Sequence, residues 1–349
     1  MKFRVLVCAA LTFGVAAFGH AQAPAAATTF DHRIALDVVV TDKSGKPVSD
    51  LQQQDFTVLD DKRTIPIASF TAAGNSGKPD DPPLRVVFVI DTLNTSFRAM
   101  SNARQHLEKF LRQDGGHLPV PMSLVIFSEK NTQVQGMPTR DGNALADSVH
   151  AINAGAQRDI QGAEYADEVE RIQISLRALG KLTAYLGKQS GRKLLIWMSP
   201  GWPMIFGPRD RLSPEAQGTN FRTIVNLSTD LRLGRTTLYS IDPLGTDDSG
   251  GLATVYYENF LEGVPFAKKV ETADLQLRVI AVQSGGLVLN RNNDLASLIA
   301  QCVDDSKAYY TLSFDSAPAD HPDEYHALQV KVNKPGLVAR TRTGYYDQR

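Results

Sequence analysis

Short apolar runs and longer amphipathic segments alternate through the middle of the chain, and this alternation constrains the fold most strongly. The apolar runs are nearly continuous, which is typical of strands covered on both faces. They occupy residues 86–90, 124–127, 194–197, 238–241 and 287–289. Helical periodicity covers residues 100–112, 142–151, 164–186, 220–233, 273–283 and 295–304. This order predicts a doubly wound, mostly parallel α/β sheet, with residues 133–137 as a candidate antiparallel edge hairpin.

The regions on either side of this alternation show strand patterns without helical periodicity. Short strands are expected at residues 34–40, 55–59 and 65–70, and again at 309–314, 327–332 and 336–345. Three strands bury too little apolar surface to be stable alone. We therefore predict that the two flanks, residues 31–75 and 306–346, complete one small β-sandwich into which an α/β domain, residues 84–305, is inserted. Two independent small modules are the alternative.

The N-terminus has the features of a secretory signal peptide. Lys2 and Arg4 precede an apolar run at residues 5–18, and the small residues Ala21 and Ala23 follow. A signal at residues 1–23 predicts an exported protein, either periplasmic or secreted, and a retained N-terminal anchor is the alternative. No later segment has the ~20 apolar residues of a membrane span. Cys302 would then be the one cysteine of the mature chain, and its apolar helical surroundings predict a buried, inert thiol.

The charge balance argues against nucleic acid as a partner. The chain has 37 basic and 38 acidic residues, and no basic stripe with interleaved aromatic side chains is present. The 42% hydrophobic residues are sufficient for a sizeable core.

One stretch joins the first strand of the middle region to a helix and carries the main candidate site. Its sequence is FVIDTLNTS, residues 88–96, in which an apolar run ends at Asp91 and a polar loop follows. Open α/β sheets bind ligands at the carboxyl ends of their strands, which is where Asp91 is expected.

These residues and several further stretches resemble the von Willebrand factor type A domain, and more closely the bacterial secreted VWFA-related family. The stretches are RVVFVID (85–91), GRKLLIWMSPG (191–201), TLYSID (237–242), VVVTDKSG (38–45), DFTV (55–58), YYTLSF (309–314) and GYY (344–346). The resemblance covers nearly all of the mature chain. It implies the same fold: a type A α/β domain within a sandwich.

The resemblance also implies a metal-ion-dependent adhesion site, which holds a divalent cation with an Asp-x-Ser-x-Ser motif, a threonine and a second aspartate. Asp91 matches the first aspartate, and Thr95 can replace the second serine. Leu93 stands at the first serine position and cannot ligate, residues 154–162 contain no threonine or serine, and Pro200-Gly201 replaces Asp-Gly. We therefore predict a degenerate site and no cofactor. The alternative is Mg²⁺ or Mn²⁺ held by Asp91, Asn94 and Thr95, since both ions prefer oxygen ligands.

In the metal-free alternative, Asp91 accepts hydrogen bonds from its own loop, and Thr95 or Ser96 caps the next helix.

Enzyme signatures are absent from the sequence. It has no Gly-x-Ser-x-Gly elbow, phosphate-binding glycine loop or His-Glu-x-x-His motif. His321 and His326 lie close to Asp323 and Glu324, but a solvated turn is expected there rather than a catalytic pair. Residues 247–251 resemble a calcium loop only loosely, and a turn is expected there too.

Two long loops leave the carboxyl ends of predicted strands. Residues 200–218 and 242–272 are long connections, which are often functional. Their candidate partner-binding side chains are Trp202, Met204, Phe206, Tyr256 and Tyr257, because aromatic and Met side chains are common in binding hot spots. Trp202 and Phe206 folding over the degenerate site is the alternative. We predict a non-catalytic module that binds another extracytoplasmic protein; a structural scaffold in an envelope assembly is the second hypothesis, and an undetected hydrolase the third.

Overall fold

The structure, a computed structural model, describes residues 33–74, 84–130, 132–152, 165–203, 212–245, 257–290, 292–316 and 319–347. The predicted signal peptide lies outside these ranges. Contacts group the chain from His32 onward into one unit.

The middle of the chain forms a six-stranded sheet with the strand order β10-β9-β8-β5-β6-β7. Its strands are β5 (Leu84–Asp91), β6 (His117–Phe127), β7 (Thr132–Asp141), β8 (Arg192–Met198), β9 (Thr236–Ile241) and β10 (Val288–Leu289). All neighbouring pairs are parallel except β6 with β7. The predicted edge hairpin is therefore confirmed. Every residue of β8 and β9 is buried, as the continuous apolar runs predicted.

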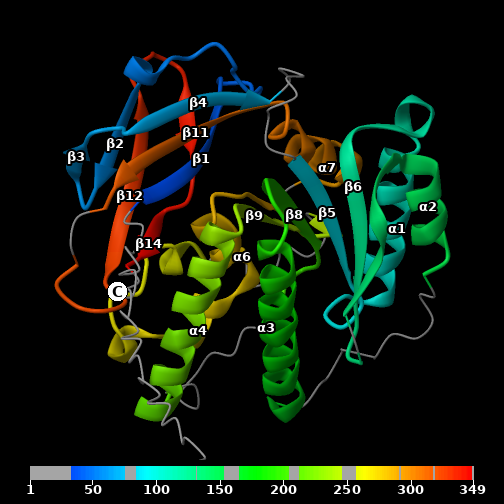
Figure 1. Cartoon of the computed structure of the whole chain (residues 1–349). Coiled ribbons are helices and arrows are strands. Elements are labelled where there is room, and N and C mark those ends of the chain that lie inside the picture. Colours follow the sequence, from blue (N-terminus) through cyan, green and yellow to red (C-terminus); the bar gives the residue numbers. More distant parts are fainter. Residues whose placement is uncertain are drawn as a thin grey trace, which may run out of the picture. The chain divides into compact units, whose positions relative to one another are not determined.

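Helices cover both faces of this sheet, so it is doubly wound (Figure 1). They are α1 (Phe97–Leu111), α2 (Gly142–His150), α3 (Tyr165–Gly187), α4 (Pro214–Leu233), α6 (Leu277–Gln283) and α7 (Leu295–Asp304). One apolar core joins a sheet face to α1, α2 and α7, and Cys302 is buried in it. The other core joins the opposite face to α3, α4 and α6. No described helix is long and apolar enough to cross a membrane.

Local capping sets where the helices begin. Ser213 accepts a hydrogen bond from Ala216 N, and Pro214 occupies the first turn of α4. This helix therefore begins six residues before the predicted residue 220. The segment predicted as one helix at 273–283 is divided, because Gln276 has an extended backbone between a 3₁₀ turn and α6. The 3₁₀ turns are Gln53–Asp55, Gln113–Gly116, Tyr257–Phe260, Ala267–Lys269 and Thr272–Leu275.

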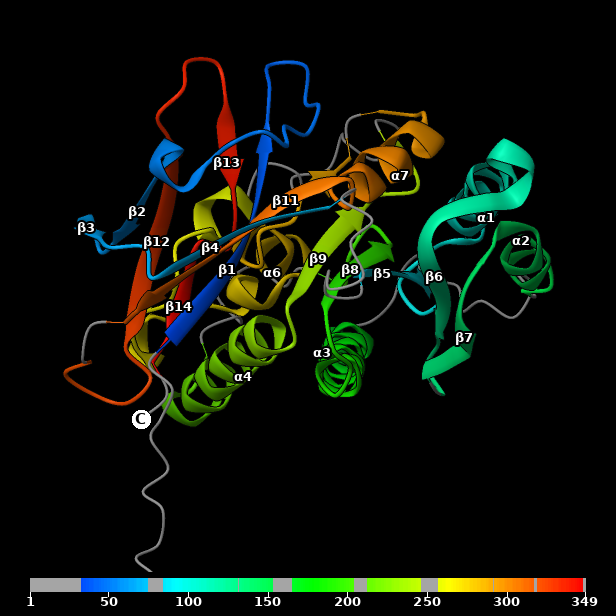
Figure 2. The ribbon, with the colours of Figure 1, turned by 45° about the horizontal axis from the view of Figure 1, so that its top comes forward.

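The two flanks together form a β-sandwich (Figure 2). One sheet has the order β13-β1-β11-β4, and the other β14-β12-β2-β3. The strands are β1 (Arg33–Thr41), β2 (Phe56–Asp60), β3 (Arg63–Ile65), β4 (Ser69–Gly74), β11 (Ala308–Asp315), β12 (Tyr325–Val332), β13 (Val338–Arg340) and β14 (Gly344–Tyr346). Each sheet mixes strands from both flanks around a shared core. The predicted fold class, an α/β domain inserted in a sandwich, is confirmed; the predicted domain boundaries stay predictions.

Two predicted strands of the sandwich were wrong in detail. The expected strand at 336–345 is two short strands, β13 and β14, in different sheets. The run at 65–70 is also divided, since β3 ends at Ile65 and β4 begins at Ser69. Pro66 stands in the gap, and proline cannot donate to a strand ladder.

Charged side chains join the α/β region to the sandwich. Arg235, in the turn before β9, forms an ion pair with Asp37 of β1 and donates to Thr311 Oγ1 over 3.0 Å. Arg340 of β13 pairs with Asp305, which follows α7. Burial alone would lower the pKa of Arg235, but the hydrogen bond and charge of Asp37 outweigh this effect and raise the pKa. The two regions are therefore packed through partly buried ion pairs.

Candidate functional site at the carboxyl ends of the strands

Asp91 is the last residue of the central strand β5, and its side chain is 0% exposed. From β5 the chain continues to β6 on one side and later returns to β8 on the other side. The strand order therefore runs outward from β5 in opposite directions. This is a topological switch point, where open α/β sheets form their ligand crevice. The sequence therefore located the candidate site in the expected part of the fold.

Four N–H groups surround the Asp91 carboxylate. Oδ1 accepts from the backbone N–H of Leu93 (3.0 Å) and of Asn94 (2.9 Å). Oδ2 accepts from Asn94 Nδ2 and from the indole Nε1 of Trp197 on β8, each over 3.0 Å. A carboxylate has about four lone-pair sites, so this hydrogen-bonding capacity is filled. Burial raises the pKa of Asp91, while the bonds from Asn94 and Trp197 act in the opposite direction.

The rest of the loop is also buried. Asn94 Nδ2 additionally lies 2.9 Å from Ser175 Oγ of α3, and Leu93 packs into the apolar core. Asn94 Oδ1 and Thr95 Oγ1 have no hydrogen-bond partner among the described residues. Ser96, one of the two residues proposed as a cap, accepts from Ala99 N at the start of α1. Most polar groups of the loop thus serve its own conformation.

This donor set does not fit the divalent cation that the resemblance implies. A cation needs free oxygen lone pairs, whereas each oxygen of Asp91 already faces two N–H donors. Leu93 supplies no ligand, and of the side-chain oxygens in the described loop 91–96, Asn94 Oδ1 and Thr95 Oγ1 are the ones without a hydrogen-bond partner. Residues 154–162, the segment that stands where the resemblance expects the threonine ligand, lie outside the described residues. We derive no metal-dependent step at Asp91.

Trp202 lies close to this loop but is not an exposed side chain. It is 5% exposed, its Nε1 donates to the carbonyl oxygen of Leu275 over 2.8 Å, and its ring meets Trp197 edge to face at 6.1 Å between centroids. This geometry supports the role of a cover over the Asp91 loop. The partner-binding role of Trp202 stays a prediction.

The other predicted partner-binding residues are less informative. Met204, Phe206 and Tyr256 lie outside the described residues. Tyr257 begins a 3₁₀ turn and is partly buried. Their role also stays a prediction.

A groove that the sequence did not reveal lies beside the Asp91 loop. It has a volume of about 520 Å³ between the β6–β7 hairpin and α3. Its lining residues include Glu129, Lys130, Val134, Arg177, Lys181 and Tyr185. Phe127 also lines the groove. Thr92 of the Asp91 loop donates to the Phe127 carbonyl oxygen from its backbone N–H (2.8 Å) and from its hydroxyl (2.9 Å), so the groove adjoins the loop. Tyr185 is 47% exposed and Val134 39%.

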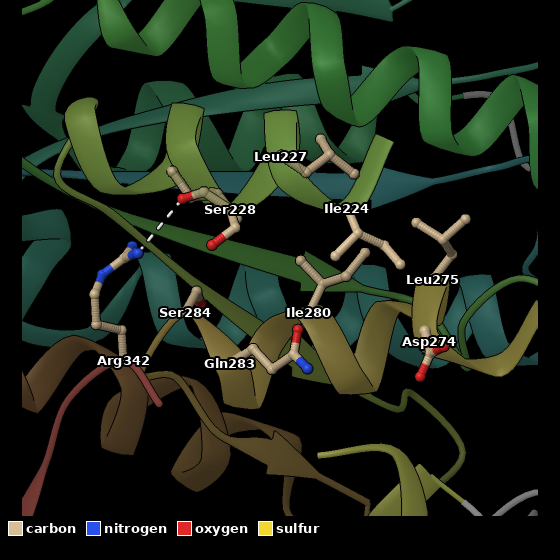
Figure 3. A pocket seen from close by; sticks show the side chains of 10 residues that line it. Ile224, Leu227, Ser228, Asp274, Leu275, Ile280, Gln283, Ser284 and Arg342 are labelled. Carbon is tan, nitrogen blue, oxygen red and sulfur yellow. Dashed lines mark hydrogen bonds between the residues drawn. The ribbon is translucent and has the colours of Figure 1, made fainter. Parts of the chain in front are cut away.

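A smaller cavity lies between α4 and α6 (Figure 3). Arg342 projects into it from the segment between β13 and β14, and its Nη1 donates to the carbonyl oxygen of Ser228 over 3.4 Å. Burial and the neighbouring Arg232 lower the pKa of Arg342 to about 9. The space, about 20 Å³, is that of roughly one water molecule. The cavity therefore does not accommodate an organic ligand.

The structure corrects the interpretation of His326. This histidine was expected in a solvated turn, but it lies in β12 and is buried beside Asp60 and Asp61. The two aspartates are more than 260 residues away in the sequence. Only the pairing of β12 with β2 brings them to the histidine, so no local pattern indicated the group.

No family model matches the chain, and no curated protein is similar to it. Similar solved structures include an aerotolerance-related membrane protein from Bacteroides fragilis, with 11% identity, a TM-score of 0.34, and coverage of 64% of this chain and 99% of that one. The SpRpn10 VWA domain has 10% identity, a TM-score of 0.29, and coverage of 63% and 94%. The pilus adhesin SpaC from Lactobacillus rhamnosus GG has 11% identity, a TM-score of 0.37, and coverage of 84% and 47%, so this chain spans about half of that adhesin. Similarities at this level assign no function.

Proposed function

We propose that the protein is an exported, non-catalytic interaction module that binds another protein at the carboxyl ends of its parallel strands. The observation that carries this proposal is the groove between the β6–β7 hairpin and α3. Because Asp91 is buried and saturated with N–H donors, a bridging cation has no part in the proposed contact. The partner would bind the groove directly.

The chemistry of the groove indicates what the partner presents. Lys130, Arg177 and Lys181 line it with one acid, Glu129. Complementary charge favours specific association and a faster encounter. Tyr185 supplies exposed aromatic surface of the kind enriched at binding hot spots. We therefore propose a partner segment that combines acidic and apolar side chains.

The hairpin offers a second means of contact. β7 is an edge strand of the six-stranded sheet, and its side chain Met137 is 86% exposed. An edge strand can pair with an extended segment of another chain. This supports a partner that lies along β7 as well as in the groove.

Export of the chain belongs to the same proposal. It rests on the signal features at residues 1–23, and the partner would accordingly be extracytoplasmic, in the periplasm or outside the cell. The scaffold in an envelope assembly is the second candidate function. The burial of Trp202 and Asp91 favours it, because the strand ends would then be sealed rather than used.

The test is affinity capture from the envelope fraction of the exporting cell, with the full exported chain as bait. The bait variants are Lys181→Glu and Tyr185→Ala in the groove, with Lys331→Glu as the control on an exposed face of the sandwich. We expect both groove variants to lose a protein that wild type and Lys331→Glu retain. Equal capture by all four baits would contradict binding at the groove.

A further inference from the structure

We propose that Asp60, Asp61 and His326 form a binding site for a divalent transition-metal ion, with Zn²⁺ as the best fit, in the β-sandwich. This inference concerns the β-sandwich, not the six-stranded sheet that carries Asp91, and is independent of the proposed function. One ligand atom from each of the three residues lies within 4.8 Å of the other two. Carboxylate oxygens and imidazole nitrogens are both ligands that Zn²⁺ takes in proteins.

The distances are compatible with a shared metal ion as well as with ion pairs of a protonated His326. His326 Nδ1 lies 3.3 Å from Asp60 Oδ1 and 3.2 Å from Asp61 Oδ2. Hydrogen bonds between an imidazolium and a carboxylate are usually about 2.7–2.9 Å long. Ligands of a tetrahedral Zn²⁺ at bond lengths of about 2.0–2.1 Å stand about 3.3 Å apart. Both separations therefore match the edges of a zinc coordination tetrahedron.

An unsatisfied buried oxygen points to the same place. Asp60 Oδ1 accepts no hydrogen bond of good geometry among the described residues, although the Asp60 side chain is 5% exposed; it faces His326 Nδ1 at 3.3 Å as an ion pair. Leaving a buried carboxylate oxygen unpaired is costly. A metal ion between Asp60 and His326 would satisfy it.

The second contacts of each ligand hold the three side chains in place. Asp60 Oδ2 accepts from the Tyr345 hydroxyl over 3.0 Å, and the Tyr345 ring stacks on His326 at 4.9 Å with an angle of 11° between the planes. Asp61 Oδ1 accepts from Ala327 N over 2.9 Å, and Asp61 N donates to Ala327 O over 2.9 Å. Such contacts orient metal ligands and raise affinity.

Solvent can reach the fourth coordination position. The Asp61 side chain is 51% exposed, in the left-handed turn between β2 and β3, where Asp61 has φ 46° and Lys62 φ 68°. A water ligand would complete a site with three protein ligands. The ion would link the β2–β3 hairpin to β12, so its expected effect is to stabilise the sandwich.

The first test is titration of the tag-free, full exported chain, treated with chelator and dialysed, with Zn²⁺ followed by calorimetry and with Co²⁺ followed by visible absorption. We expect about one equivalent of each ion to bind, a d–d spectrum of low-symmetry Co²⁺, and a melting temperature that rises with Zn²⁺ concentration. Mg²⁺ serves as the control ion and should leave the melting temperature unchanged. Absence of Zn²⁺ heat and of a Co²⁺ spectrum would overturn the proposal.

The second test uses conservative variants of two of the ligands. Asp61→Asn keeps an oxygen for Ala327 N but removes the charged ligand from an exposed side chain, and His326→Gln removes the nitrogen ligand. Asp320→Asn, an exposed carboxylate close in sequence to His326, is the matched control. We expect Asp61→Asn and His326→Gln to weaken Zn²⁺ binding at least ~10-fold, with Asp320→Asn unchanged. Equal Zn²⁺ affinity in all of these proteins would place the ion elsewhere and overturn the assignment.

Discussion

The indole N–H of Trp197 donates a hydrogen bond to Oδ2 of Asp91 across the boundary between the neighbouring strands β8 and β5. A donor therefore occupies a lone pair that a bound cation would need. This contact also explains how a carboxylate is kept inside an apolar core, since burial of a charge requires hydrogen-bonding partners.

Asp91→Asn is expected to destabilise the protein by about 3 kcal/mol. The amide group of Asn has one acceptor atom and places N–H groups against donors, so at least two buried N–H groups lose their partner at about 1–3 kcal/mol each. Urea unfolding measures the loss, and we expect the same value with and without millimolar Mg²⁺. Calorimetric heat from Mg²⁺ or Mn²⁺ that wild type shows and Asp91→Asn lacks would contradict the metal-free description of this loop.

Trp202→Ala is expected to lower the free energy of unfolding by about 3–5 kcal/mol, as usual for truncation of a buried aromatic side chain. Trp202→Phe retains most of the ring and loses the hydrogen bond to Leu275, so it should cost about 1 kcal/mol. Denaturant unfolding of both variants gives the comparison. A Trp202→Ala protein with unchanged stability and weakened partner capture would instead assign Trp202 to binding.

The stability of the protein should increase with pH above about 8 because of Lys193. Burial, with repulsion from Arg235 and Arg85, lowers the pKa of Lys193 in the folded protein to about 8. The unfolded value is about 10.4, so between these values the unfolded chain binds more protons and folding gains stability as pH rises. Below pH 8 the cost of the buried ammonium group is fully present.

Lys193→Met removes this titrating group. We expect the variant to be more stable than wild type at pH 7, with a difference that shrinks toward pH 10. Unfolding free energies at pH 7, 8, 9 and 10 test this, with Lys331→Met as the exposed-lysine control. A difference that does not depend on pH would show that Lys193 is not the responsible group.

The ion pair of Asp37 with Arg235 should couple the α/β region to the sandwich. Removing one partner leaves the other partly buried and unpaired, so Asp37→Ala and Arg235→Ala are each expected to cost about 2–4 kcal/mol. The double variant should cost clearly less than the sum of the two. A double-mutant cycle from urea unfolding measures this coupling, and additive losses would mean that the pair does not act as a unit.

The sequence predicted the fold class well because each strand and helix carries its own pattern. The runs that became β8 and β9 are buried on both faces, and this burial is visible in consecutive residues. The prediction that the two flanks share one sandwich came from the need to bury enough apolar surface, not from a local sequence motif. Strand ends such as Pro66 and the helix start at Ser213 depend on single backbone positions, which periodicity does not resolve.

Of the residues that form the candidate site, the sequence pattern indicated Asp91 but not the side chains around it. Asp91 was found from its place after a strand, whereas Trp197 had been assigned only to the core of its strand. The position of Ser175 next to Asn94 depends on how α3 packs against the sheet. His326 was assigned to the surface because its partners, Asp60 and Asp61, are brought to it only by strand pairing across the inserted domain.

The pairing of β4 with β11 has a consequence for the order in which the chain assembles. Gly74 lies opposite Ala308 in this ladder, so the sheet joins segments about 230 residues apart. Closing so long a loop has an entropic cost, which a previously folded insert would reduce by holding its two ends near each other. During synthesis the N-terminal strands are made long before their C-terminal partners are available. Their open edges would then be exposed to other chains, and this interval is when a chaperone would protect the protein most.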